Sequence, residues 1–234
     1  PDQPLLPLSA AVCGALVSLS AVPTHAQTSA TLPAVSVTAT PEIRREPSSP
    51  KATAPLLDTP QTISVIPREV FQEQGARNLT DILRNTPGIS FNAGENGFGS
   101  NTNDFSLRGF STSGNIFVDG VRDSGNFARD AFNLEQVEVV KGPAADNGRG
   151  GAGGYVNLQT KTPKPGEFAL GSIGLGMDEY GSDLSLRSTL DINRRFSENG
   201  AVRLNFLAEG GGVAGREHAR RDSLGFAPSV TFGL

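Results

Sequence analysis

The stretch DLSLRSTLDIN, residues 183–193, alternates large apolar and polar side chains with a period of two. Its apolar members fall on even positions: Leu184, Leu186, Leu190 and Ile192. Successive side chains of a β-strand point to opposite faces, so this spacing predicts a strand with one apolar face and one polar face.

Three further segments extend the same pattern. The even positions are apolar in AVRLNFLAE (201–209) and SLGFAPSVTFGL (223–234), and ALGSIGLGM (169–177) is a weaker member. A tight turn, SENG (197–200), and a longer glycine-rich loop, GGGVAGREHARR (210–221), join them alternately. This layout is typical of an outer-membrane β-barrel, although a soluble β-sandwich shows similar alternation.

The N-terminal residues decide between these two readings. The apolar run LLPLSAAVCGALVSLSAV (5–22), followed by PTHAQ (23–27), resembles a secretory signal peptide, so we assign residues 1–26 to a signal peptide that is N-terminally incomplete. Export favours the barrel. Since four strands cannot close a barrel, we expect residues 164–234 to be the first strands of a truncated transmembrane β-barrel.

Composition excludes several classes of function. The net charge of −4 argues against nucleic acid as a partner. The only cysteine, Cys13, lies in the predicted signal peptide, so the mature chain would lack disulfides and thiol chemistry. Of the two histidines only His218 would remain, and we expect it in a solvated loop. We therefore predict that the protein is not an enzyme.

The segment 27–57 is rich in Pro, Ser, Thr and Ala and is predicted to be flexible. Within it, AVSVTAT (34–40) is a short β-prone stretch. It is either a stray strand of the next domain or a docking peptide that adds to the sheet edge of a partner.

Residues 58–163 read as a small α+β domain. QTISVIP (61–67) predicts a strand, Pro67 suits the first position of a helix over REVFQEQ (68–74), and NLTDILRNTPG (78–88) predicts a second helix capped by Asn78. Strands then follow in ISFNA, DFSLRGF, NIFVDGV, EQVEVVKG and GGYVNLQT, joined by loops of small and polar residues.

The stretch GRGGAGG (148–154) has the G-x-G-x-x-G spacing of a dinucleotide site. That site needs a helix to begin at its third glycine. Here YVNLQTKTP (155–163) alternates and ends at a proline, so it predicts a strand. We therefore expect these glycines to form a turn between two strands, where the backbone is tightly packed.

In this order, six segments resemble the TonB-dependent outer-membrane siderophore receptors. They are AVSVTAT (34–40), similar to a TonB box, DTPQTISVIPREVFQEQGARNLTDILRNTPGI (58–89), FSLRGF (105–110), IFVDGVRD (116–123), EQVEVVKGPAADNGRGGAGGYVNLQTKTP (135–163) and HARRDSLGFAPSVTFGL (218–234). Residues 92–133 are most similar to catecholate siderophore receptors. The resemblance implies an α+β plug domain inside a 22-stranded barrel in the outer membrane of a Gram-negative cell.

The resemblance also implies partners and sites. TonB would pair with Ala34, Val35, Ser36, Val37, Thr38, Ala39 and Thr40. The cargo would be iron bound to a siderophore, with no resident cofactor, and outer-membrane lipid would surround a monomer. An anionic ferric catecholate needs cations, donors and aromatic faces, and the candidates at the plug apex are Asn92, Asn96, Phe98, Asn101, Asn103, Ser113, Asn115, Arg122, Asn126, Phe127 and Arg129.

Two other cations, Arg108 and Lys141, are expected at strand ends of the plug, where the family places cations against barrel-wall glutamates. Two alternatives stay open: a receptor that signals ligand occupancy, and TonB-dependent uptake of another ligand. The sequence does not identify the siderophore.

Overall fold

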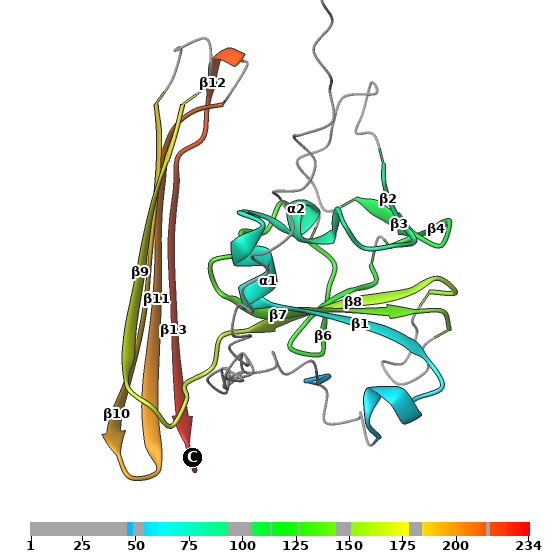
Figure 1. Cartoon of the computed structure of the whole chain (residues 1–234), viewed down its shortest axis with the longest axis horizontal. Helices are drawn as coiled ribbons and strands as arrows, with labels where there is room; N and C mark the ends of the chain where they lie inside the picture. The colour runs from blue at the N-terminus through cyan, green and yellow to red at the C-terminus, as the bar shows by residue number, and fades with distance from the viewer. Residues whose placement is uncertain are drawn as a thin grey trace, which may run out of the picture. The chain divides into compact units, whose positions relative to one another are not determined.

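The computed structural model describes residues 46–48, 54–92, 104–112, 114–125, 127–143, 151–177, 184–213 and 216–234. The predicted signal peptide and the segment 34–40 lie outside these residues. The elements are drawn in Figure 1.

A five-stranded sheet organises the α+β domain, with strand order β1-β7-β8-β5-β6. Its strands are β1 (Thr62–Pro67), β5 (Ile116–Val118), β6 (Val121–Asp123), β7 (Leu134–Lys141) and β8 (Gly154–Thr160). The pair β5–β8 is parallel and the other neighbouring pairs are antiparallel. The predicted strands on both sides of the glycine stretch are therefore confirmed as β7 and β8.

Short helices follow β1. The 3₁₀ turn η1 (Leu56–Asp58) precedes it, and α1 (Arg68–Glu73) and α2 (Leu79–Leu83) follow. Asn78 caps α2 as predicted, because its side chain accepts a hydrogen bond from the backbone N of Asp81 at 2.9 Å. The placement of Pro67 at the first helical position was wrong: Pro67 has extended ψ, ends β1 and is the N-cap of α1.

A three-stranded sheet, β2-β3-β4, completes the domain. It consists of β2 (Ile89–Phe91), β3 (Phe105–Leu107) and β4 (Phe110–Ser111). Arg108 lies in the turn between β3 and β4 with φ +54°, so the expectation of a strand end is corrected to a turn for this residue.

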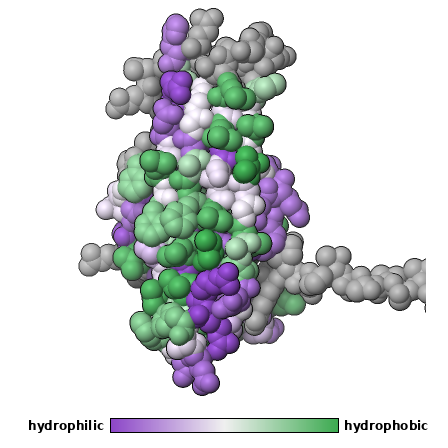
Figure 2. Space-filling view, turned by 90° about the vertical axis from the view of Figure 1, so that its left-hand side faces the viewer, coloured by the Kyte–Doolittle hydropathy of each residue, from purple (hydrophilic) through white to green (hydrophobic). Residues whose placement is uncertain are grey.

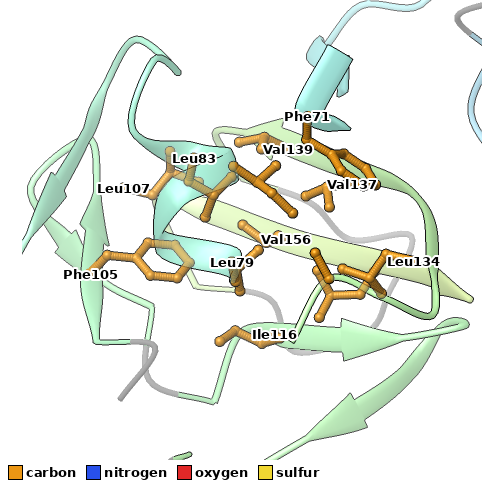
Figure 3. Close-up of a cluster of buried hydrophobic side chains, with 13 residues drawn as sticks. Phe71, Leu79, Leu83, Phe105, Leu107, Ile116, Leu134, Val137, Val139 and Val156 are labelled. Atoms are coloured by element: carbon orange, nitrogen blue, oxygen red, sulfur yellow. The ribbon is translucent and has the colours of Figure 1, made fainter. Parts of the chain in front are cut away.

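The core of the domain forms between the helices and one face of the five-stranded sheet. Phe71 of α1 and Leu79 and Leu83 of α2 meet Val137 and Val139 of β7 (Figure 3). Burying these apolar surfaces supplies most of the driving force that holds short helices in place, since isolated helices of five or six residues are not stable in water.

The C-terminal strands form a second sheet, ordered β12-β11-β10-β9 with β13 paired to β11. The bounds are β9 (Phe168–Gly176), β10 (Ser185–Ser197), β11 (Gly200–Val213), β12 (Arg216–Arg220) and β13 (Ser223–Phe232). The four predicted strands are confirmed. The predicted glycine-rich loop is partly wrong, because β11 runs on to Val213 and β12, which contains exposed His218, pairs back on it.

The two faces of this sheet differ as the periodicity predicts. Apolar side chains on the even positions of β10, β11 and β13 are exposed, including Leu186, Leu190, Phe206, Leu224, Phe226, Val230 and Phe232. Figure 2 shows the apolar surface that they form. The opposite face buries polar residues: Asp191, Asn193, Arg203, Asn205 and Glu209. An apolar outer face and a polar inner face characterise transmembrane barrel strands.

The described part of the glycine stretch, residues 151–154, packs tightly against the backbone of neighbouring strands. A Cβ on Gly153 would lie 2.3 Å from the carbonyl oxygen of Leu107, and one on Gly154 would lie 1.9 Å from that of Val140. Gly154 also has φ +117°. The prediction of a close backbone approach is confirmed at these two positions.

Candidate ligand-binding and plug-seating sites

Arg129 is the centre of a compact cluster on the loop after β6. Its Nη2 pairs with the carboxylate of Asp123 and donates to the carbonyl of Gly125 at 3.1 Å. Its guanidinium lies 4.3 Å from the ring centroid of Phe127, which is 59% exposed. Burial alone would raise the pKa of Asp123, but the hydrogen bonds from Gly125 N and Arg129 outweigh it and lower the pKa. The cluster presents an aromatic face backed by a cation that is already paired.

Arg122 is the second cation of this region that lies beside an aromatic ring. Its side chain is exposed on β6, and its guanidinium lies 5.5 Å from the ring centroid of Phe117. A cation supported by an aromatic ring and open to solvent can still bind an anion.

Two asparagines have structural partners. Asn115 is only 8% exposed, and its Oδ1 accepts from the backbone N of Gly151 at 3.3 Å. Asn92 donates to Asp104 Oδ1 at 2.9 Å and accepts from Ser106 Oγ at 3.2 Å, which closes the base of the segment 93–103. The structure thus gives both amides a bracing role, and in this conformation the buried side chain of Asn115 is not open to a ligand.

The remaining predicted ligand residues lie outside the described residues: Asn96, Phe98, Asn101, Asn103, Ser113 and Asn126.

Arg108 and Lys141 lie close enough together for their charges to interact. Burial, and then the charge of Arg108, lower the pKa of Lys141. Among the described residues, no carboxylate forms an ion pair with either cation. Two adjacent cations repel each other, so the pair is suited to an anionic partner.

A network of buried ion pairs joins the α+β domain to the C-terminal sheet. The sequence alone did not predict this network. We call its first part the Asp191 seam. Arg203, which is fully buried, donates to Asp191 from Nε at 2.8 Å and from Nη2 at 2.7 Å. Lys161 Nζ lies 3.1 Å from Asp191 Oδ2 and donates to Asn205 Oδ1 at 3.0 Å.

The start of α1, at Arg68, and the start of β7, at Glu135, also contribute side chains to the Asp191 seam. Arg68 Nη1 lies 3.4 Å from Asp191 Oδ2, and Arg203 Nη1 lies 3.1 Å from Glu135 Oε2. Lys164 pairs with the other carboxylate oxygen of Glu135. Burial lowers the pKa of Lys161, and the charge of Asp191 only partly opposes that effect. The seam therefore joins charges from three segments of the α+β domain to β10 and β11.

The second part, which we call the Glu209 seam, joins the loop between α1 and α2 and the loop before β7 to the same strands. Arg187 donates to both carboxylate oxygens of Asp130, at 2.8 and 2.6 Å, and also to Glu209. Arg77 Nη1 donates to Glu209 Oε1 at 3.2 Å. The polar residues on the odd positions of the strands were visible in the sequence, but their partners were not.

Between the two seams lies a cavity of about 570 Å³. It is lined by α1 and by β9 and β10, with Arg68, Phe71, Phe132, Lys161, Arg187 and Asp191 among its residues. In the part of the chain that the structure describes, no group of three or more His, Cys, Asp or Glu side chains could hold a metal ion. Within the same residues, no helix is long and apolar enough to cross a membrane.

Comparison with known proteins defines the class. Residues 55–155 match the family model of the TonB-dependent receptor plug domain. The chain is 45% identical over 231 residues to the probable TonB-dependent receptor BfrD of Bordetella pertussis, and 41% identical over 192 residues to the catecholate siderophore receptor Fiu of Escherichia coli K12. These alignments cover 97% and 81% of the chain but only 30% and 25% of the two relatives.

Solved structures agree with the sequence relatives. The closed form of the ferric-catecholate import receptor Fiu from E. coli K12 matches with a TM-score of 0.70 at 40% identity, over 82% of this chain and 26% of that one. The siderophore receptor PiuA of Acinetobacter baumannii matches with a TM-score of 0.73 at 36% identity, over 82% and 27%.

The α+β domain is therefore a receptor plug, and the sheet after it consists of barrel strands. The chain belongs to the TonB-dependent receptors and spans less than a third of the length of these relatives.

Proposed function

We propose that the protein is an outer-membrane receptor that imports ferric siderophores with energy supplied through TonB. The observation that supports this best is the match to the Fiu import receptor, which extends over the plug and the first barrel strands at 40% identity. Iron would be cargo, so the proposal includes no resident cofactor and no catalytic step.

The catecholate class is the finer part of the proposal. A ferric tris-catecholate is anionic and aromatic, so it is suited to cations beside aromatic rings. Arg129 over the exposed ring of Phe127 offers this combination on the plug, and Arg122 adds an exposed cation over the buried ring of Phe117. The candidates Asn96, Phe98, Asn101, Asn103, Ser113 and Asn126 would add donors and a further ring.

The N-terminal segment 34–40 is the proposed contact with TonB. A β-prone peptide can add to the sheet edge of a partner through its backbone N–H groups. Proline removes one such donor. In the complete protein, Val35→Pro with Val37→Pro should leave folding and ligand binding unchanged and abolish iron uptake, whereas Val35→Ile with Val37→Ile should import normally. Normal uptake by the proline variant would refute the proposal.

Two other functions make different predictions for the same experiment. A receptor that signals occupancy would change transcription of a reporter without importing iron. A transporter of another ligand would fail to bind any ferric catecholate while still depending on residues 34–40.

A further inference from the structure

The five-stranded sheet has a second face, opposite the main core. Phe117, Val140 and Tyr155 are buried there, with Ile63 packed against them. The rings of Phe117 and Tyr155 meet edge to face, with centroids 5.3 Å apart. This cluster is much smaller than the main core, so polar contacts matter more on this face.

Glu138 is the buried acid of this face, and only 2% of it is exposed. Its carboxylate accepts from Asn157 Nδ2 at 3.2 Å and from Gln136 Nε2 at 2.7 Å. Among the described residues no Lys or Arg forms an ion pair with it. A buried carboxylate without a counter-ion depends on hydrogen bonds from neutral donors.

A further donor to Glu138 comes from far away in the sequence. The backbone N of Ser48 donates to Glu138 Oε1, and Gln136 Nε2 donates to the carbonyl of Glu46 at 3.1 Å. We call Glu46–Ser48 the strap. Both contacts are made by backbone groups of the strap, so they do not depend on the side chains of the strap.

We propose that the second sheet face is a docking surface for the strap, and that Glu138 holds the strap there until the chain on its N-terminal side is pulled. The strap precedes β1 in the sequence, and β1 is paired along its whole length with β7. Tension applied on the N-terminal side therefore reaches the contacts at Glu138 and Gln136 before it reaches the β1–β7 ladder. Once the strap leaves, water can replace its hydrogen bond to the carboxylate, so release is reversible.

The origin of that tension rests on the proposed function, in which TonB binds residues 34–40. We call the contacts of the strap with Glu138 and Gln136 the latch. The latch does not depend on the proposed function, and it can be measured without TonB or siderophore.

The test places a spin label at position 48 in the complete protein. Ser48 contributes only its backbone N to the contact, so Ser48→Cys keeps the latch; Cys13 and any other cysteine are replaced by serine. In the unchanged background the label should be immobile. Glu138→Ala should shorten its rotational correlation time by about threefold or more, toward that of an exposed chain end, and Glu138→Gln, which keeps volume and an acceptor but loses the charge, should give an intermediate value.

Two controls make the result decisive. Glu73→Gln removes an exposed acid of α1 and should leave the label at position 48 unchanged. A label at Ser90→Cys on β2 should be equally mobile in every variant, which would show that the domain remains folded. If Glu138→Ala changes the mobility at position 90, that variant is misfolded, and the comparison at position 48 is made with Glu138→Gln. Equal mobility at position 48 with Glu138 and with both replacements would overturn the proposal, whatever the uptake assays show.

Discussion

The guanidinium of Arg203 donates two hydrogen bonds to the carboxylate of Asp191, from Nε to Oδ1 at 2.8 Å and from Nη2 to Oδ2 at 2.7 Å. Both residues belong to neighbouring barrel strands, yet the same carboxylate also contacts Lys161 and Arg68 of the plug. One barrel-wall acid thus gathers charges from both parts of the protein.

Removing Arg203 should destabilise the folded protein strongly. Arg203→Met leaves Asp191 buried beside fewer cations, and breaking a buried pair on one side costs about 3–5 kcal/mol. Arg194→Met is the matched control, because Arg194 pairs with Glu167 while 60% exposed, and such pairs contribute about 1 kcal/mol or less. Urea unfolding of the complete protein measures both. Similar losses for the two variants would contradict the importance of the seam.

The stability of the plug contacts should depend on pH through Glu135. Burial alone would raise the pKa of this carboxyl, but the hydrogen bond from Lys164 and the charges of Lys164, Arg203 and Arg68 hold the pKa below its ordinary value of 4.5. A carboxylate with a lowered folded-state pKa adds stability above the unfolded-state pKa and loses it as the pH falls through the folded-state value. Stability should therefore decline below pH 4.5, and less steeply in Glu135→Gln. Lys164→Met should bring the folded-state pKa of Glu135 closer to its unfolded-state value, so this variant should lose less stability than the parent as the pH falls below 4.5. Urea midpoints measured across the acid range test this.

Gly154→Ala should disrupt the plug turn. The new Cβ would lie 1.9 Å from the carbonyl oxygen of Val140, on a residue with φ +117°. Strain of this kind costs on the order of 1–3 kcal/mol for the backbone alone, and the clash adds to it. Gly166→Ala is the control, because nothing lies within 4 Å of its added Cβ. Limited proteolysis should cut the Gly154→Ala plug faster than the control.

The two arginine–aromatic pairs, Arg122 with Phe117 and Arg129 with Phe127, should differ in their response to mutation. Arg129 is held by Asp123 and Gly125, so Arg129→Gln should disturb its loop as well as weaken ligand binding. Arg122→Gln should weaken binding of a ferric catecholate by roughly tenfold or more, in line with the loss of a charge-assisted hydrogen bond of about 1.5–3 kcal/mol, with a smaller effect on the loop than Arg129→Gln. Titration calorimetry and thermal unfolding separate the two effects.

The sequence predicted those elements whose signals are local. The period of two in residues 183–193 depends only on one face meeting lipid and the other meeting polar groups, so β10 was found, as was the cap of Asn78. The segment 216–220 was missed because Gly212 and Val213 look like a loop and become a strand only through pairing with β12.

The plug-to-wall ion pairs could not be read from the sequence. Arg187 and Asp130 are 57 positions apart, and Lys161 and Asn205 are 44 apart. Nothing in the spacing of such residues says which acid faces which base, because the pairing is decided by how the plug sits against the strands. Within the plug, Asn115 looks like a typical loop residue in the sequence, but folding brings it against Gly151, which is 36 positions away.

The lipid-facing assignment of the even positions can be tested on β13 with two adjacent residues of similar size. Val230 is exposed on the apolar face, and Thr231 points to the opposite face. A lysine on the lipid side of a barrel strand costs about 2–4 kcal/mol at the bilayer midplane and about 0–1 kcal/mol near the interfaces. Val230→Lys should therefore reduce the folding free energy in lipid vesicles by roughly 1–3 kcal/mol, and Thr231→Lys should cost less, because its ammonium can reach the polar interior. If the threonine variant were the more damaging of the two, the even positions would not face lipid.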